Sequence, residues 1–168
     1  MKKIKTLQAV LIVLIMLVTT SVAYAAPPDQ RNFIAHLSGD SERPVPVDTD
    51  AGGLAVLHVN KDETEIRYKL IVTNLENATM AHIHCGSADV AGPVVAFLFG
   101  PVAGVSDNGV LAEGTVTATD VISRPDSAAC PGGVADFDDL LAKIRSGDAY
   151  VNVHTMAFPG GEIRGQIE

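Results

Sequence analysis

The chain has 168 residues, 47% of them hydrophobic, and carries 20 Asp and Glu against 12 Lys and Arg, a formal net charge of −8 at pH 7. Nucleic acids and anionic membranes repel a surface of that sign, so neither is an expected partner. An acidic surface favours solubility and is compatible with the attraction of cations.

The first 25 residues have the three parts of a secretory signal peptide. Three lysines lie within the first five residues, an apolar run covers residues 9–18, and Ala23-Tyr24-Ala25 supplies a small-x-small cleavage site. The alternative is a retained anchor, but a membrane span requires about 20 apolar residues, and Thr19 ends this run too early. We therefore predict cleavage after Ala25, a secreted or periplasmic location, and no stable membrane anchor in the mature protein.

The mature chain is predicted to form one domain. Removal of residues 1–25 leaves 143 residues, with nine Lys and Arg against the same 20 acids and a net charge of −11. That length is sufficient for a single hydrophobic core. Residues 26–31 contain two prolines and are predicted to form a short disordered leader, so the domain is expected to cover residues 32–168.

Most of the mature chain consists of strand-length segments separated by turn residues, a pattern typical of an antiparallel sandwich or barrel. Within 64–73, for example, Ile66, Leu70 and Val72 alternate with polar residues, as in a half-buried strand. The proline-broken stretch 41–50 is not expected to form a central strand, because proline lacks the backbone donor. The predicted strands are 33–37, 53–60, 64–73, 79–84, 94–99, 109–119, 150–155 and 162–167.

One short helix is predicted near residues 136–146. Its apolar residues fall at helical spacing on a single face: Phe137, Leu140, Leu141 and Ile144. Asp136 is a suitable N-cap, and Gly147 is suited to end the helix in the left-handed conformation.

The two cysteines, Cys85 and Cys130, are predicted to form one disulfide. An even number of cysteines in an exported chain favours such a bond, because free thiols seldom persist in an oxidising compartment. The alternative is a thiolate metal site, since Cys85 follows His84 directly.

Several segments along the chain resemble the CHRD domain, the chordin-type domain. They are 33–39 followed by Glu42, 81–84 (AHIH) followed by 92–95 (GPVV), 147–155, and 159–166 (PGGEIRGQ). The chain is thereby identified as a bacterial, secreted, single-domain member of that family. The resemblance implies an all-β, antiparallel immunoglobulin-like sandwich or barrel, here with one short helix near 136–146.

Three histidines are the strongest candidates for a functional site. Alternate side chains of a strand lie on opposite faces, so His82 and His84 share one face of their strand. In the closing strand 150–155, Asn152 and His154 share the face opposite to the valines. If the two strands are neighbours, His82, His84 and His154 converge, and imidazole ligands suit copper or zinc.

The alternative is a structural role, in which the histidines form a buried hydrogen-bond network with polar neighbours. If a metal binds, Asn152, Glu162 and Arg164 are candidates to orient the ligands from behind, and Glu162 or a water is a candidate to complete the site. His36 and His58 lie on other strands and are expected to have structural roles.

These observations leave two expectations for function. The first is an exported, non-catalytic binding module of the CHRD type whose ligand, a protein or another molecule, the sequence does not define. The second is a periplasmic or extracellular protein that binds copper or zinc through His82, His84 and His154. No nucleophile–base constellation can be named, so an enzyme, including one resembling superoxide dismutase, is not expected.

Overall fold

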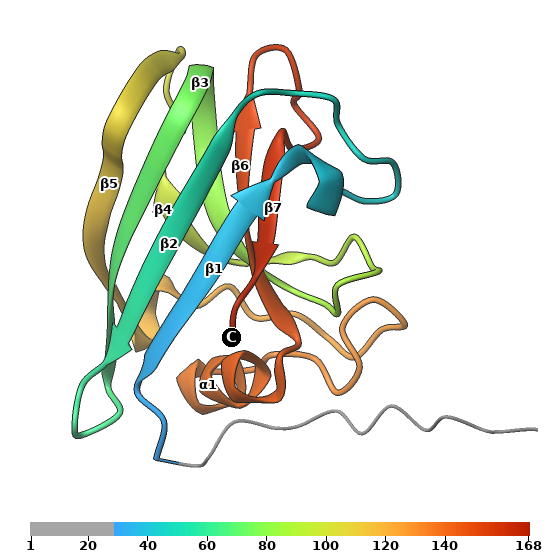
Figure 1. Cartoon of the computed structure of the whole chain (residues 1–168). Helices are drawn as coiled ribbons and strands as arrows, with labels where there is room; N and C mark the ends of the chain where they lie inside the picture. The colour runs from blue at the N-terminus through green and yellow to red at the C-terminus, as the bar shows by residue number, and fades with distance from the viewer. Residues whose placement is uncertain (1–28) are drawn as a thin grey trace, which may run out of the picture.

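The computed structural model describes residues 29–168 (Figure 1). The predicted signal peptide, residues 1–25, lies outside the described residues. No helix within 29–168 combines the length and the apolar character that crossing a membrane requires.

Seven antiparallel strands form one sheet, and the order of pairing β2-β1-β7-β6-β3 returns to β2 because β3 also pairs with β2. The sheet therefore closes into a small barrel, with β4 and β5 as extra strands on β3 (Figure 1). This confirms a mostly β fold with one short helix; the finer expectation of an immunoglobulin-like sandwich is not confirmed. The strands are β1 Asn32–Ser38, β2 Gly52–Val59, β3 Glu65–Cys85, β4 Val94–Phe99, β5 Val105–Thr117, β6 Ala149–Thr155 and β7 Ile163–Gln166.

Strand β3 differs from the sequence prediction, which divided it into 64–73 and 79–84. Asn74 and Asn77 adopt left-handed φ angles of 52° each, and the pairing with β5 shifts register on both sides of Leu75. Asparagine tolerates this conformation, so the turn-favouring residues bend the strand as bulges instead of ending it. The first half of β3 pairs with β2 and β5, and the second half pairs with β6 and β4.

The core lies inside the barrel, and helix α1, Phe137–Ser146, covers its lower end in the view of Figure 1. The four apolar residues of the predicted stripe are all buried. Asp136 caps the helix by accepting a hydrogen bond from the Asp139 amide at 3.0 Å, and Gly147 ends it with φ 75°. The predicted helix and both of its ends are therefore confirmed.

The predicted disulfide is present between Cys85, at the end of β3, and Cys130, in the segment before α1, with a Cα–Cα distance of 5.4 Å. Both residues are fully buried. Because both sulfur atoms are bonded to each other, the alternative of a thiolate metal site does not apply.

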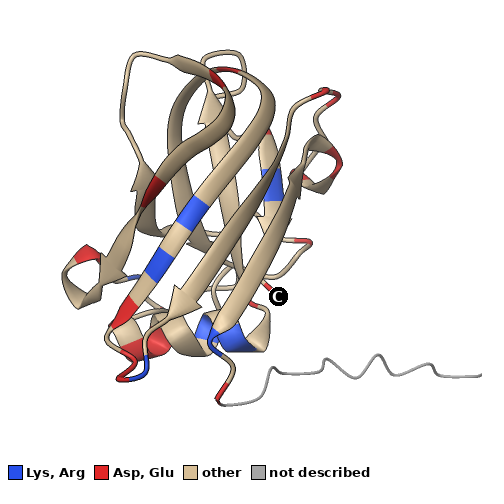
Figure 2. Ribbon diagram, turned by 60° about the vertical axis from the view of Figure 1, so that its left-hand side comes forward, with Lys and Arg blue, Asp and Glu red and all other residues tan. Residues whose placement is uncertain are grey.

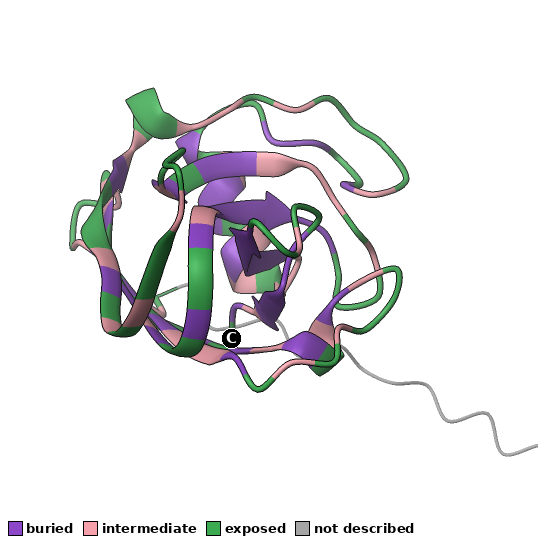
Figure 3. Ribbon diagram, turned by 90° about the horizontal axis from the view of Figure 1, so that it is seen from above, coloured by how far each residue is buried: buried purple, intermediate pink, exposed green. Residues whose placement is uncertain are grey.

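Every residue of β6 is buried, so both faces of this strand are covered. Viewed from above, the buried strands lie toward the middle of the molecule, and loops with exposed residues surround them (Figure 3). In the ribbon of Figure 2, acidic residues are found in several loops and strands. The second face of β6 therefore forms a protected region outside the barrel core.

Closure of the barrel requires a glycine at position 165. A Cβ atom built there would overlap the carbonyl oxygen of His36 on β1. We expect Gly165→Ala to lower the free energy of unfolding by about 1–3 kcal/mol, because β1 and β7 must move apart. Denaturant unfolding followed by circular dichroism measures the change. Gly160→Ala is the matched control, since nothing lies within 4 Å of its added Cβ; equal stability of the two variants would contradict the expectation.

Candidate metal centre

The pairing of β3 with β6 brings the three candidate histidines together. His82 lies opposite Asn152 and His84 lies opposite Tyr150 in the antiparallel register. Residues directly opposite each other share a face of the sheet, so His154, two residues beyond Asn152, is on the same face. The prediction that segments 79–84 and 150–155 are neighbours, with their histidines on one side, is confirmed. The opposite face carries the fully buried core residues Ala81, Ile83, Val151 and Val153.

All three imidazoles are buried, with exposed fractions of 4% for His82 and 7% for His84 and His154. The ring of Tyr150 stacks on His84 at a centroid distance of 4.8 Å. The ring of Phe97, on β4, packs against His82 in a T-shaped arrangement with a centroid distance of 4.4 Å. The histidines therefore line an enclosed polar region on the outer face of the sheet, and solvent does not reach them freely.

Backbone carbonyls fix the orientation of two of the rings. Nδ1 of His84 donates a hydrogen bond to the Gly92 carbonyl at 2.9 Å, and Nδ1 of His154 donates to the Pro159 carbonyl at 3.0 Å. A neutral imidazole carries one proton, so Nε2 of each ring presents a lone pair. Neither Nε2 has a hydrogen-bond partner among the described residues, and both ring nitrogens of His82 also lack one.

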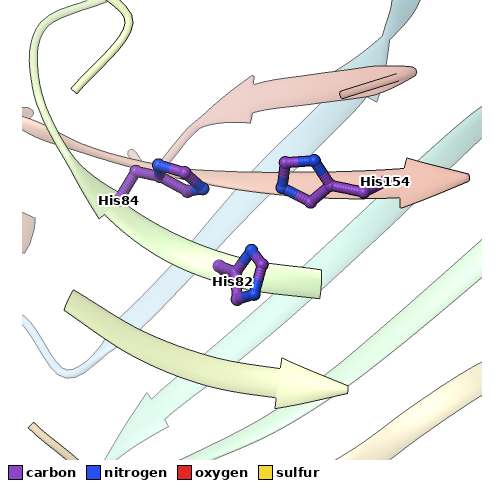
Figure 4. A group of neighbouring side chains, drawn as sticks. All are labelled: His82, His84 and His154. Atoms are coloured by element: carbon purple, nitrogen blue, oxygen red, sulfur yellow. The ribbon is translucent and has the colours of Figure 1, made fainter. Parts of the chain in front are cut away.

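The ring nitrogens of the three histidines converge. One ligand atom from each residue lies within 4.8 Å of the others. Figure 4 shows His82 and His84 on β3 and His154 on β6 with their rings directed into the same space. Buried polar atoms normally have partners, so a group of unpaired nitrogens around one point is an unusual arrangement that a bound cation would satisfy.

The environment keeps the imidazoles neutral. Burial lowers the pKa of His82 to about 4, with a further contribution from the proximity of His154 and His84. Burial also lowers the pKa of His84 to about 4, against the opposing effect of its hydrogen bond to Gly92. The pKa of His154 is lowered by burial as well. At neutral pH all three rings are therefore in the form that binds metal ions.

Asn152 and Arg164 belong to a polar network beside the histidines. Asn152 donates a hydrogen bond to Oε2 of Glu42 at 3.2 Å. The Arg164 guanidinium lies 3.4 Å from the centroid of the Tyr150 ring and donates to the Ser87 carbonyl at 2.7 Å. Arg164 thus supports the face of Tyr150, the ring that stacks on His84. Neither Asn152 nor Arg164 has a hydrogen bond to an imidazole in the described chain, so their orienting role stays a prediction.

Glu162 is engaged by two hydroxyl groups. Its carboxylate accepts hydrogen bonds from Thr49 and Thr155, each at 2.7 Å. It is not part of the group whose ligand atoms converge. Its participation as a ligand or as an orienting group therefore also stays a prediction.

Glu42 is a buried acid to which the sequence analysis assigned no role. Only 3% of its surface is exposed, and burial raises its pKa to about 7, against the opposing effects of the Asn152 hydrogen bond and the positive charge of Arg164. Its position in the opening motif was visible in the sequence, but the surrounding prolines indicated only that stretch 41–50 forms no central strand. His36 and His58, by contrast, are exposed on β1 and β2 and lie outside the histidine group.

The fold and the site define a small antiparallel β-barrel that carries a buried group of three histidines on the outer face of its sheet. The model of the CHRD domain family matches residues 33–167, and the chain belongs to this family. Comparison with curated proteins gives no match, and comparison with solved structures gives none either.

Proposed function

We propose that this CHRD domain is an exported, non-catalytic module that binds a transition-metal ion, copper or zinc. The ligands are Nε2 of His84, Nε2 of His154 and one ring nitrogen of His82. The observation that carries the proposal is the set of unpaired ring nitrogens on three buried, neutral imidazoles whose ligand atoms lie within 4.8 Å of one another.

Two features support metal binding over a purely structural network. A structural network is stabilising when its buried polar atoms are paired, because an unpaired buried group costs about 1–3 kcal/mol; here the Nε2 atoms of His84 and His154 and both ring nitrogens of His82 are unpaired. In addition, metal-ligating histidines commonly donate their other ring N–H to a backbone carbonyl. His84 and His154 each make such a bond.

The chemistry of the ligands indicates the class of metal. Imidazole nitrogen suits copper and zinc, whereas calcium and magnesium require several oxygen ligands. No carboxylate is part of the converging group within residues 29–168.

The disulfide supports an oxidising compartment for the proposed module. Export to such a compartment agrees with a signal peptide over residues 1–25. In this proposal, a leader over residues 26–31 follows the signal peptide, and the domain begins at residue 32.

Thermal unfolding with and without metal tests the proposal. We expect copper or zinc, at a free concentration about 100 times its dissociation constant, to stabilise the wild-type protein by roughly 2.7 kcal/mol, because the metal binds only the folded state. His154→Ala removes one of the three ligands and is expected to abolish the stabilisation. The measurement is the unfolding midpoint by circular dichroism, with chelator-treated protein as the reference.

His58→Ala is the matched control, since the exposed side chain of His58, on β2, has a hydrogen bond only to the side chain of Asn32 among the described residues. This variant should keep the full metal-induced shift. If metal raises the midpoint of neither the wild type nor His58→Ala, the histidines are scaffold and the proposal is wrong. An equal shift in His154→Ala and the wild type would also contradict it.

A further inference from the structure

Met80 lies beside the histidine group. In the register of β3 and β6, Met80 is directly opposite His154. It also precedes His82 by two residues on the same strand. Its position relative to His154 and to His82 therefore places it on the same face of the sheet as the histidines. The pairing is regular from Met80 through Cys85, and Ala81 beside it points into the core. The bulge before Met80 therefore does not alter its face.

The side chain of Met80 begins close to that of His154, its partner in the antiparallel register. Cβ atoms of directly opposed residues in an antiparallel pair lie about 5 Å apart, and the unbranched methionine side chain adapts to irregular space. Met80 is half-buried, so its side chain is partly covered on the same face of the sheet as the histidines.

Building on the proposed function, we propose that Met80 is the fourth ligand of the site and that the site is selective for the cuprous ion, Cu(I). Thioether sulfur is a soft ligand that favours Cu(I), whereas zinc binds preferentially to imidazole, thiolate and carboxylate. Three imidazoles and one thioether form an entirely neutral ligand set.

The burial of the site supports a monovalent ion. The three imidazoles are at most 7% exposed, and an ion bound by neutral ligands keeps its full charge in this enclosed region. The cost of burying charge without compensation rises with the charge. Cu(I) leaves one positive charge there, whereas Zn(II) or Cu(II) leaves two. A carboxylate ligand would offset that difference, but none belongs to the converging group in residues 29–168.

Metal titrations of Met80→Leu test the inference. Leucine retains the apolar volume and removes the sulfur atom. We expect Met80→Leu to weaken Cu(I) binding by about 10- to 100-fold, the range seen when interactions around a metal site are lost, and to change Zn(II) affinity less than about twofold, since zinc gains little from a thioether. Cu(I) affinity is measured without oxygen, by competition with a chromophoric chelator. X-ray absorption of the copper-loaded protein should show one sulfur neighbour that is lost in the variant.

Met156→Leu is the matched control, because Met156 is 64% exposed beyond the end of β6. It should bind Cu(I) as the wild type does. If Met80→Leu keeps wild-type Cu(I) affinity, or the wild-type copper spectrum contains no sulfur, the assignment of Met80 is overturned while the three-histidine site stands. If the wild type binds neither Cu(I) nor Zn(II), the proposed function itself fails.

Discussion

We expect the double variant Cys85→Ala, Cys130→Ala to lose about 4 kcal/mol of unfolding free energy, the largest effect of any change discussed for this domain. The two cysteines are 45 residues apart, and a cross-link over that length removes chain entropy from the unfolded state worth about 4 kcal/mol. Both sulfur atoms are fully buried, so alanine introduces no unpaired polar group. The unfolding midpoint should fall by on the order of 10 °C.

The same bond stabilises the surroundings of His84. Cys85 follows His84, and its amide donates a hydrogen bond to the Pro93 carbonyl at 3.0 Å. The neighbouring residue, Gly92, accepts the hydrogen bond from His84. Loss of the disulfide should therefore also weaken metal binding.

Thermal unfolding with and without a reducing agent measures the effect of the disulfide. Reduction should bring the wild-type midpoint to that of the double variant, while the double variant itself should not respond to the reductant. A wild-type midpoint that does not change when both thiols are shown to be free would contradict the expectation.

Acidification is expected to produce the second large effect, a loss of stability in the metal-free protein between pH 7 and pH 5. The pKa values of His82 and His84 are about 4 in the folded state, against 6.5 for the free side chain. Below pH 6.5 the unfolded chain therefore binds protons that the folded chain does not, and the folded state loses stability until about pH 4. Each of these two histidines should contribute a loss of about 2 kcal/mol over the window. The lowered pKa of His154 acts in the same direction.

Glu42 should offset part of that loss. Its pKa is raised from 4.5 to about 7, so the folded state binds a proton first as the pH falls from 7. The stabilising contribution of Glu42 to the free energy of unfolding is fully present below pH 4.5 and is lost as the pH rises through about 7. Between pH 7 and pH 5 this amounts to a gain of about 2 kcal/mol. Glu63, whose pKa is lowered by its hydrogen bonds to Arg145, titrates below this window.

The variant Glu42→Gln separates the loss of stability caused by the histidines from the gain caused by Glu42. Glutamine has no proton to gain, so the variant should lose about 4 kcal/mol between pH 7 and pH 5, whereas the wild type should lose about 2 kcal/mol. The measurement is denaturant unfolding at pH 7, 6 and 5 with a chelator present, followed by circular dichroism because the chain has no tryptophan. Identical pH dependence in the two proteins would show that Glu42 does not titrate as inferred.

Local sequence patterns were sufficient to predict most of the secondary structure. The i, i+3, i+4 spacing of Phe137, Leu140 and Leu141 depends only on the helical period, and the helix begins and ends as its capping residues indicate. The alternation in the first half of β3 was equally informative. The prediction was wrong at residues 74–78, because asparagines that favour turns also tolerate the bulges of a long, bent strand.

The candidate site was partly predictable. The sequence by itself determined that His82 and His84 share a strand face, that His154 lies on the corresponding face of the closing strand, and that the two cysteines form a disulfide. These conclusions follow from the two-residue period of a strand and from the chemistry of exported thiols, which do not depend on distant residues.

Only the tertiary structure decided that the histidine face is enclosed. Its neighbours come from distant parts of the chain: Glu42 precedes β2, the Gly92 carbonyl lies between β3 and β4, and the Pro159 carbonyl follows β6. A single strand cannot reveal which loops will cover its outer face, because closure of the barrel sets their positions. That closure determines which ring nitrogens have partners, and the atoms left unpaired at His82, His84 and His154 are those to which we assign the metal.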